Sequence, residues 1–132
     1  MRRFGLVVAI TTALLLTLAT AGVAGPVKDA RYRVRQGGKV ALRYFDRKGT
    51  FERFNSSKAG RLEPNLAWVD RREPADGGQV DIAFGGARRL LLITRTLGGR
   101  WFCTVTTGRG NQTAGAGASF SSLDTKSECI GA

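Results

Sequence analysis

The stretch QVDIAFGGARRLLLITRTLGGRWFCTVTT, residues 79–107, decides the fold of this chain. It divides into three apolar segments that are separated by glycine pairs, where the chain can reverse because glycine accepts positive φ. In the first segment Val80, Ile82 and Phe84 occupy alternate positions, which is the period of a strand with one buried face. The sequence therefore predicts an antiparallel β-meander, and the apolar face of such a small sheet needs a cover.

A helical pattern lies upstream, in residues 28–48, KDARYRVRQGGKVALRYFDRK. Apolar or small residues recur there at spacings of three and four, which is typical of an amphipathic helix. They are Ala30, Val34, Gly37, Gly38, Ala41, Tyr44 and Phe45. Each interior glycine weakens a helix by about 1 kcal/mol, so the pattern also fits a kinked helix or two short ones. We expect an α+β fold, in which an N-terminal amphipathic helix packs on a small antiparallel meander of three to four strands.

The first 24 residues have a composition of their own. Arg2 and Arg3 precede an apolar run that begins at Phe4, and small residues follow up to Ala24. A charged start, an apolar middle and a small-residue end together predict a signal peptide. Residues 4–24 are also long enough to serve as an uncleaved anchor. In both cases we expect residues 25–132 to form one exported domain, secreted or at the cell surface, that contacts a membrane only if residues 4–24 are retained.

The chain has two cysteines, Cys103 and Cys129, and no histidine. An exported protein meets an oxidising environment, which favours a disulfide between them. The residues between them are mostly Gly, Ala, Ser and Thr, with Phe120 and Leu123 as the main apolar side chains. Two cysteines without a histidine cannot complete an ordinary zinc site. The sequence therefore predicts a structural bridge that closes a C-terminal loop, with no metal and no cofactor.

Charge points to an anionic partner. The chain has 21 Lys and Arg against 10 Asp and Glu, a formal net charge of +11. Such an excess favours binding to nucleic acid or to an anionic cell-envelope polymer. The candidate residues lie on the predicted helix and meander and are Arg31, Arg35, Lys39, Arg43, Arg88, Arg89, Arg100 and Trp101. For any one arginine, a solvated face that keeps the domain soluble is the alternative interpretation.

Catalysis has little support in the sequence. Without histidine the chain offers no Ser-His or Cys-His pair. A Ser-Lys pair would have to come from Ser56 or Ser57 with Lys58, in a polar segment whose side chains are expected to be solvated. We therefore expect no catalytic residue and a protein that is not an enzyme.

The order of these parts resembles the globular headgroup of type IV pilin-like and pseudopilin-like proteins, in particular short bacterial exported ones. After the apolar segment and helix come KGTF at 48–51, LEPNLAWV at 62–69, the two strands of the meander, GRWFC at 99–103, and Cys129. The resemblance implies a surface, assembly or accessory protein whose partners are other pilin-like subunits or envelope components. The sequence departs from that family at its N-terminus, because Gly5 is followed by Leu6-Val7-Val8-Ala9-Ile10 without the usual glutamate. The resemblance therefore implies the fold more strongly than a filament.

Overall fold

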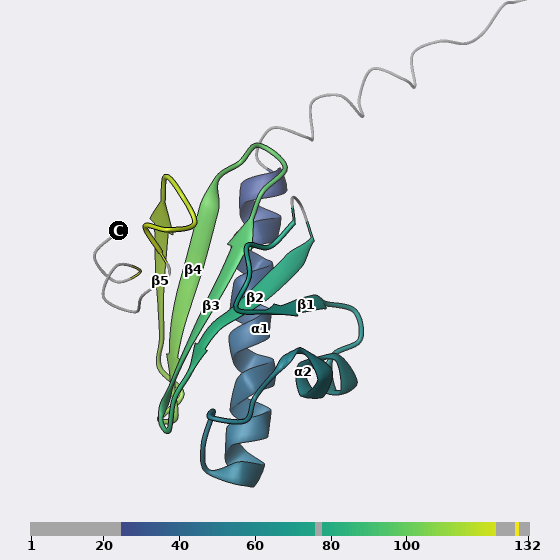
Figure 1. The fold of residues 1–132 in the computed structure, drawn as a ribbon, viewed down its shortest axis with the longest axis vertical. Coiled ribbons are helices and arrows are strands. Elements are labelled where there is room, and N and C mark those ends of the chain that lie inside the picture. The colour runs from purple at the N-terminus through teal and green to yellow at the C-terminus, as the bar shows by residue number, and fades with distance from the viewer. Residues whose placement is uncertain (1–24, 76–77, 124–128, 130–132) are drawn as a thin grey trace, which may run out of the picture.

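A long helix lies along one face of a five-stranded sheet in the computed structural model, which describes residues 25–75, 78–123 and 129 (Figure 1). The predicted signal peptide or anchor, residues 1–24, lies outside the described residues. Among the described helices, none is both long enough and apolar enough to cross a membrane. The elements are α1 (Gly25–Lys48), α2 (Ser56–Leu62), β1 (Ala67–Asp70), β2 (Gln79–Gly85), β3 (Arg89–Arg95), β4 (Trp101–Thr107) and β5 (Gln112–Gly117).

The sheet has the order β1-β2-β3-β4-β5. Strands β2 to β5 form an antiparallel meander, and β1 pairs with β2 in parallel. The α+β class is confirmed, but the expected count of three to four strands is wrong. Two strands come from segments with weak strand composition: β1 has four residues, and β5 is QTAGAG. Backbone pairing with a neighbouring strand outweighs propensity at both edges.

The predicted helix is continuous from Gly25 to Lys48, without a break at the two glycines. A Cβ on Gly37 would lie 2.9 Å from Leu92 Cδ1, and one on Gly38 would lie 2.7 Å from Thr106 Oγ1. The helix therefore passes so close to the sheet at this point that a side chain would not fit between them. The glycines weaken the isolated helix and permit its packing.

Two cores lie on opposite faces of the sheet. Between α1 and the sheet, Val34, Ala41 and Tyr44 pack with residues such as Val80 and Leu92. On the far face the core consists of Leu91, Ile93, Trp101, Cys103, Val105, Leu123 and Cys129. Successive residues of β3 alternate between the two cores, so Leu90 to Ile93 are all fully buried. Strand β3 is thus the centre of the domain.

The expected alternation fails at the end of β2. Val80 and Ile82 are buried, as predicted, but 47% of Phe84 is exposed. The pairing of β2 with β3 shifts between Ile82 and Phe84, so an extra residue enters β2 there. Such a β-bulge turns the following side chains to the other face. Phe84 consequently leaves the core under α1, because the period of two is broken before it.

The predicted disulfide is present. Cys103 and Cys129 are bonded, with their Cα atoms 6.0 Å apart, and both are fully buried in the far-face core. The segment after β5 reaches this core through Phe120, whose ring lies 5.6 Å from that of Trp101, and through Leu123. A Cβ added to Gly117 would lie only 2.8 Å from Leu123 Cδ2, so this position leaves no room for a side chain. The small residues of β5 therefore let the C-terminal segment lie directly on the sheet.

Candidate anion-binding site

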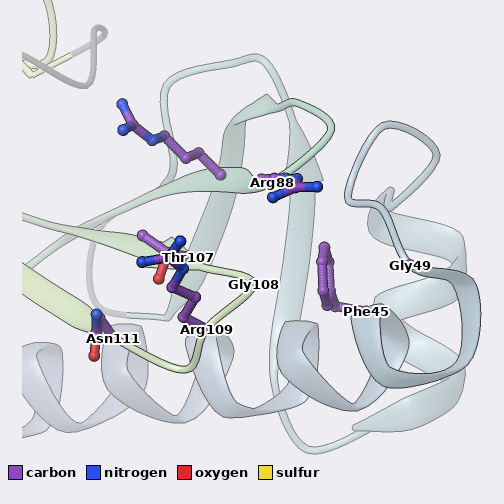
Figure 2. Close-up of a pocket in the computed structure, with 8 residues that line it drawn as sticks. Phe45, Gly49, Arg88, Thr107, Gly108, Arg109 and Asn111 are labelled. Carbon is purple, nitrogen blue, oxygen red and sulfur yellow. The ribbon is translucent and has the colours of Figure 1, made fainter.

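A hollow of about 640 Å³ lies at the end of the sheet where two turns meet the end of α1 (Figure 2). The turns join β2 to β3 and β4 to β5. The lining residues are Phe45, Gly49, Arg88, Arg89, Thr107, Gly108, Arg109 and Asn111. Three of the eight are arginines, and none is acidic. The composition of the lining suits an anion.

Main-chain hydrogen bonds join the walls of the hollow. Gly108 N donates to Arg88 O at 2.9 Å, which ties one turn to the other. Phe51 N donates to Gly86 O at 3.0 Å, which ties the β2–β3 turn to the loop after α1. That loop starts at Gly49, whose φ of +70° ends the helix in a conformation that favours glycine. The backbone around the hollow is therefore held in place before any ligand arrives.

The floor of the hollow is an aromatic side chain. The ring of Phe45 packs against that of Phe51, with 4.7 Å between their centroids. On Gly108, a Cβ would lie 2.6 Å from Phe45 Cε1, so the glycine backbone lies against the ring. Because Phe45 already packs on these two neighbours, it supports the turn and offers little ring face to a ligand.

The arginines of the hollow are exposed, and no described side chain neutralises them. Among the described residues, Arg88, Arg89 and Arg109 make no side-chain hydrogen bond or ion pair. The hydroxyl Oγ1 of Thr107 is buried and has no hydrogen-bond partner. Figure 2 shows Thr107 and Arg109 on the same side of the hollow, with Arg88 nearer to Phe45. The hollow thus combines unneutralised guanidinium groups with an unused hydroxyl.

A second basic hollow, of about 320 Å³, uses the neighbouring positions of the last turns of α1. It is lined by Tyr44, Arg47, Lys48, Lys58, Arg61 and Leu62. Lys58 Nζ lies 3.4 Å from Tyr44 Oη and 5.4 Å from the centre of that ring. Four of the six lining residues are cations. The end of α1 therefore has a basic hollow on each side.

The polar segment around α2 does not bring serine and lysine together. Asn55 caps this helix by accepting a hydrogen bond from Lys58 N at 2.9 Å. Ser56 Oγ donates to Asp70 Oδ2 at 2.5 Å, and the ammonium group of Lys58 points to Tyr44. These side chains hold α2 against its neighbours.

The structure distributes the sequence-predicted cations over several places. Arg88 and Arg89 belong to the hollow at the end of the sheet. Arg31 and Arg35 line a separate hollow of about 330 Å³ beside β4 and β5, and Arg100 directly precedes β4, at the opposite end of that strand from Thr107. Lys39 and Arg43 are exposed on α1. The candidate set is therefore not one surface.

Trp101 does not belong to the exposed set. Only 4% of it is exposed, and it packs in the far-face core against Phe120. The guanidinium carbon of Arg95 lies 4.9 Å from its ring centre. A ring covered in this way has no free face on which a base could stack.

Sequence reasoning missed Arg109, Thr107 and Phe45 as site residues. The signal was the triplet Gly108-Arg109-Gly110, which carries a cation in a tight turn. Gly110 has φ of +91°, and its N–H donates to Thr107 O at 2.9 Å. Because the sequence does not predict β5, it gives no indication that this turn lies beside Arg88.

Two further charged groups belong to the structure of the domain: Arg33 is half-buried, and Asp81 is fully buried. Arg33 donates to Thr94 Oγ1 at 3.1 Å and to Arg95 O at 3.2 Å, and burial lowers its pKa. Asp81 Oδ1 accepts from Arg72 N at 3.0 Å, whereas Oδ2 is buried without a partner. Burial raises the pKa of Asp81 to about 6. Arg33 therefore fastens α1 to β3, and Asp81 fastens the segment after β1 to β2.

Comparison of the chain with protein-family models, with curated proteins and with solved structures finds no match.

Proposed function

We propose that this chain is a non-enzymatic exported domain of pilin-like architecture, acting as a surface protein or as an assembly or accessory subunit. The observation that carries the proposal is the course of α1. This helix of 24 residues begins directly after the apolar segment 4–24 and lies along one face of an antiparallel meander. The disulfide-linked C-terminal segment contributes to the core on the opposite face. A helical stem, a sheet and a bridged C-terminal segment are the parts that the pilin-like resemblance implies.

The proposal is tested by expressing the full chain in a bacterium. The envelope and the medium are then analysed for the N-terminal residue and the intact mass, without reductant. A start near Gly22 or Gly25, with a mass two hydrogens below the reduced value, indicates a released accessory or surface domain. Retention of residues 4–24 in the membrane fraction, with cross-linked ladders on intact cells, indicates an assembling subunit.

A matched variant makes the export result interpretable. Arg2→Glu with Arg3→Glu removes the charged start that a signal segment needs and leaves residues 25–132 unchanged. We expect this variant to remain inside the cell with free thiols. A wild-type chain that also stays inside, with Cys103 and Cys129 reduced, would contradict the proposal.

The second candidate function is a basic binding module for an anionic polymer. It is favoured by the hollow at the end of the sheet, where Arg88, Arg89 and Arg109 meet without an acidic side chain in the lining. This function does not depend on export or on assembly, so the two proposals can fail separately.

A further inference from the structure

We propose that the hollow formed by Arg88, Arg89, Arg109 and Thr107 binds the sugar–phosphate backbone of a single-stranded nucleic acid. The inference specifies the ligand of the second candidate function and rests on that function. It does not rest on pilin-like architecture.

The first step is the chemistry of the hollow. A guanidinium group presents parallel N–H donors that match the oxygens of a phosphate, and charged hydrogen bonds of this kind are the strong ones. Three such groups come from two turns that a hydrogen bond of 2.9 Å, from Gly108 N to Arg88 O, holds together. The hydroxyl of Thr107 is buried without a partner, and it adds one donor when its side chain turns into the hollow. A phosphate oxygen would supply the acceptor that Thr107 lacks.

The second step is the length of the ligand. The two basic hollows use neighbouring residues at the end of α1: Phe45 and the following loop residue Gly49 line the first, and Tyr44, Arg47 and Lys48 line the second. Together they place seven cations around the last turns of the helix, which are Arg47, Lys48, Lys58, Arg61, Arg88, Arg89 and Arg109. One phosphate group would leave most of these charges unused. A polymer with a phosphate on every unit can engage both hollows at once.

The third step is the flexibility of the ligand. A chain that reaches both hollows must bend around the end of one helix, whose diameter is about 10–12 Å. Duplex DNA stays straight over about 150 base pairs and cannot make this bend, whereas a single strand can. We therefore expect a duplex of the same length to bind more weakly than the single strand.

The fourth step is the absence of base recognition. Trp101 is buried, and Phe45 packs on Phe51 and Gly108, so neither ring presents a free face at this site. Binding should then depend on phosphates alone. An abasic strand, which keeps the sugar–phosphate backbone, is expected to bind within about threefold of oligothymidine, because stacking of bases would otherwise contribute about 1–3 kcal/mol each.

The experiment measures fluorescence anisotropy of a labelled oligothymidine 12-mer with the oxidised full chain, between 50 and 200 mM salt. The site variant is Arg88→Gln with Arg109→Gln. The control is Arg35→Gln with Arg100→Gln, which removes two exposed charges from elsewhere. We expect the site variant to bind about tenfold more weakly or worse, since a hydrogen bond to a charged group contributes about 1.5–3 kcal/mol. Its salt slope should fall by about 1.4, at about 0.7 per phosphate contact.

Two comparisons distinguish binding in the hollow from a diffuse effect of the net charge. The control variant should lose less than about threefold and keep its slope, whereas equal losses in both variants would overturn the site and leave only a diffuse charge effect. Thr107→Val keeps every charge and the shape of the side chain, and we expect it to weaken binding about threefold. Unchanged affinity in the site variant, with thermal midpoints showing that all variants fold, would refute the proposal.

Two further ligands test the chemistry. Polyglutamate carries carboxylates at a comparable density and should compete poorly, because it lacks tetrahedral oxyanions; equal competition would overturn the assignment to phosphate. An abasic strand that binds tenfold more weakly than oligothymidine would overturn recognition by the backbone alone. Failure of any of these tests leaves the export experiment untouched.

Discussion

Replacing Gly38 by alanine adds one methyl group to α1 where the helix crosses β4 and β5. In a solvated helix this change is favourable by about 1 kcal/mol, because glycine has the greater backbone freedom to lose. Here the new Cβ would lie 2.7 Å from Thr106 Oγ1 and would also overlap the amide end of Gln112. Whether the free energy of unfolding rises or falls depends on whether the gain in helix propensity or the cost of this overlap is larger.

The overlap at Gly38 cannot be relieved cheaply. Gln112 has a long side chain that can rotate, but Thr106 is fully buried and branched at Cβ, so its hydroxyl has few alternative positions. The helix must therefore move away from the sheet, which loosens the packing of neighbouring residues such as Val34 and Ala41. Overpacking of this kind costs about 1–3 kcal/mol. After the helix term is subtracted, we expect Gly38→Ala to lower the free energy of unfolding by about 1 kcal/mol.

Gly60 in α2 is the matched control. A Cβ there meets no atom within 4 Å, so only the helix term remains. Gly60→Ala should raise the free energy of unfolding by roughly 0.5–1 kcal/mol. Calorimetry of the oxidised protein should show the two midpoints moving in opposite directions by roughly 4–8 °C each, which is the shift that 1 kcal/mol gives in a domain of this size. An increase in midpoint for Gly38→Ala would refute the close approach of helix and sheet.

Two more predictions concern buried groups on the far face. Cys103→Ser with Cys129→Ser opens a loop with a sequence separation of 26. Urea unfolding should show that the free energy of unfolding falls by about 3–4 kcal/mol. A fall below about 1 kcal/mol would mean that the bridge adds little to the stability that packing gives. Asp81 has a pKa of about 6 in the folded state and therefore holds its proton more tightly there than in the unfolded state. Its contribution to the free energy of unfolding is present below about pH 4 and is lost as the pH rises through 6. We expect a decline of about 1–2 kcal/mol that Asp81→Asn removes, measured as the difference between the two unfolding curves; parallel curves from pH 4 to 7 would contradict the burial of an unpartnered Oδ2.

The parts of the fold that the sequence predicts are those with a repeating or pairwise signal. The spacing of Ala30, Val34 and Ala41 identifies the buried side of α1, and the two cysteines identify the bridge. Strand β5 has no such signal, because its glycines are required by the residues that pack directly on them in the folded domain. Only the position of Cys129 over Gly115 explains why a side chain is absent there.

The candidate site was predictable to a smaller extent. Arg88 lies in a turn that the glycines mark, Arg89 begins the strand that follows, and the sequence identifies both as candidates. Arg109 lies about twenty positions further on, and it joins them only because β3 and β4 pair from Arg89↔Thr107 to Arg95↔Trp101. Register across a sheet depends on long-range packing, which neither composition nor periodicity contains. The same limit applies to the bulge that moves Phe84 out of the core.

The alternation of β3 between two cores has a consequence for the order of folding. Leu90 and Leu92 can be covered as soon as α1 meets the meander, since that helix precedes every strand in the chain. Leu91 and Ile93 must wait for Leu123 and Cys129, which follow all five strands. A ribosome or a translocation channel delivers these residues last. Until then the face of the sheet against α1 is covered, and the opposite apolar face is exposed. Any chaperone that assists this protein should therefore recognise the face of the sheet opposite α1, and should release it when the sulfur atoms join.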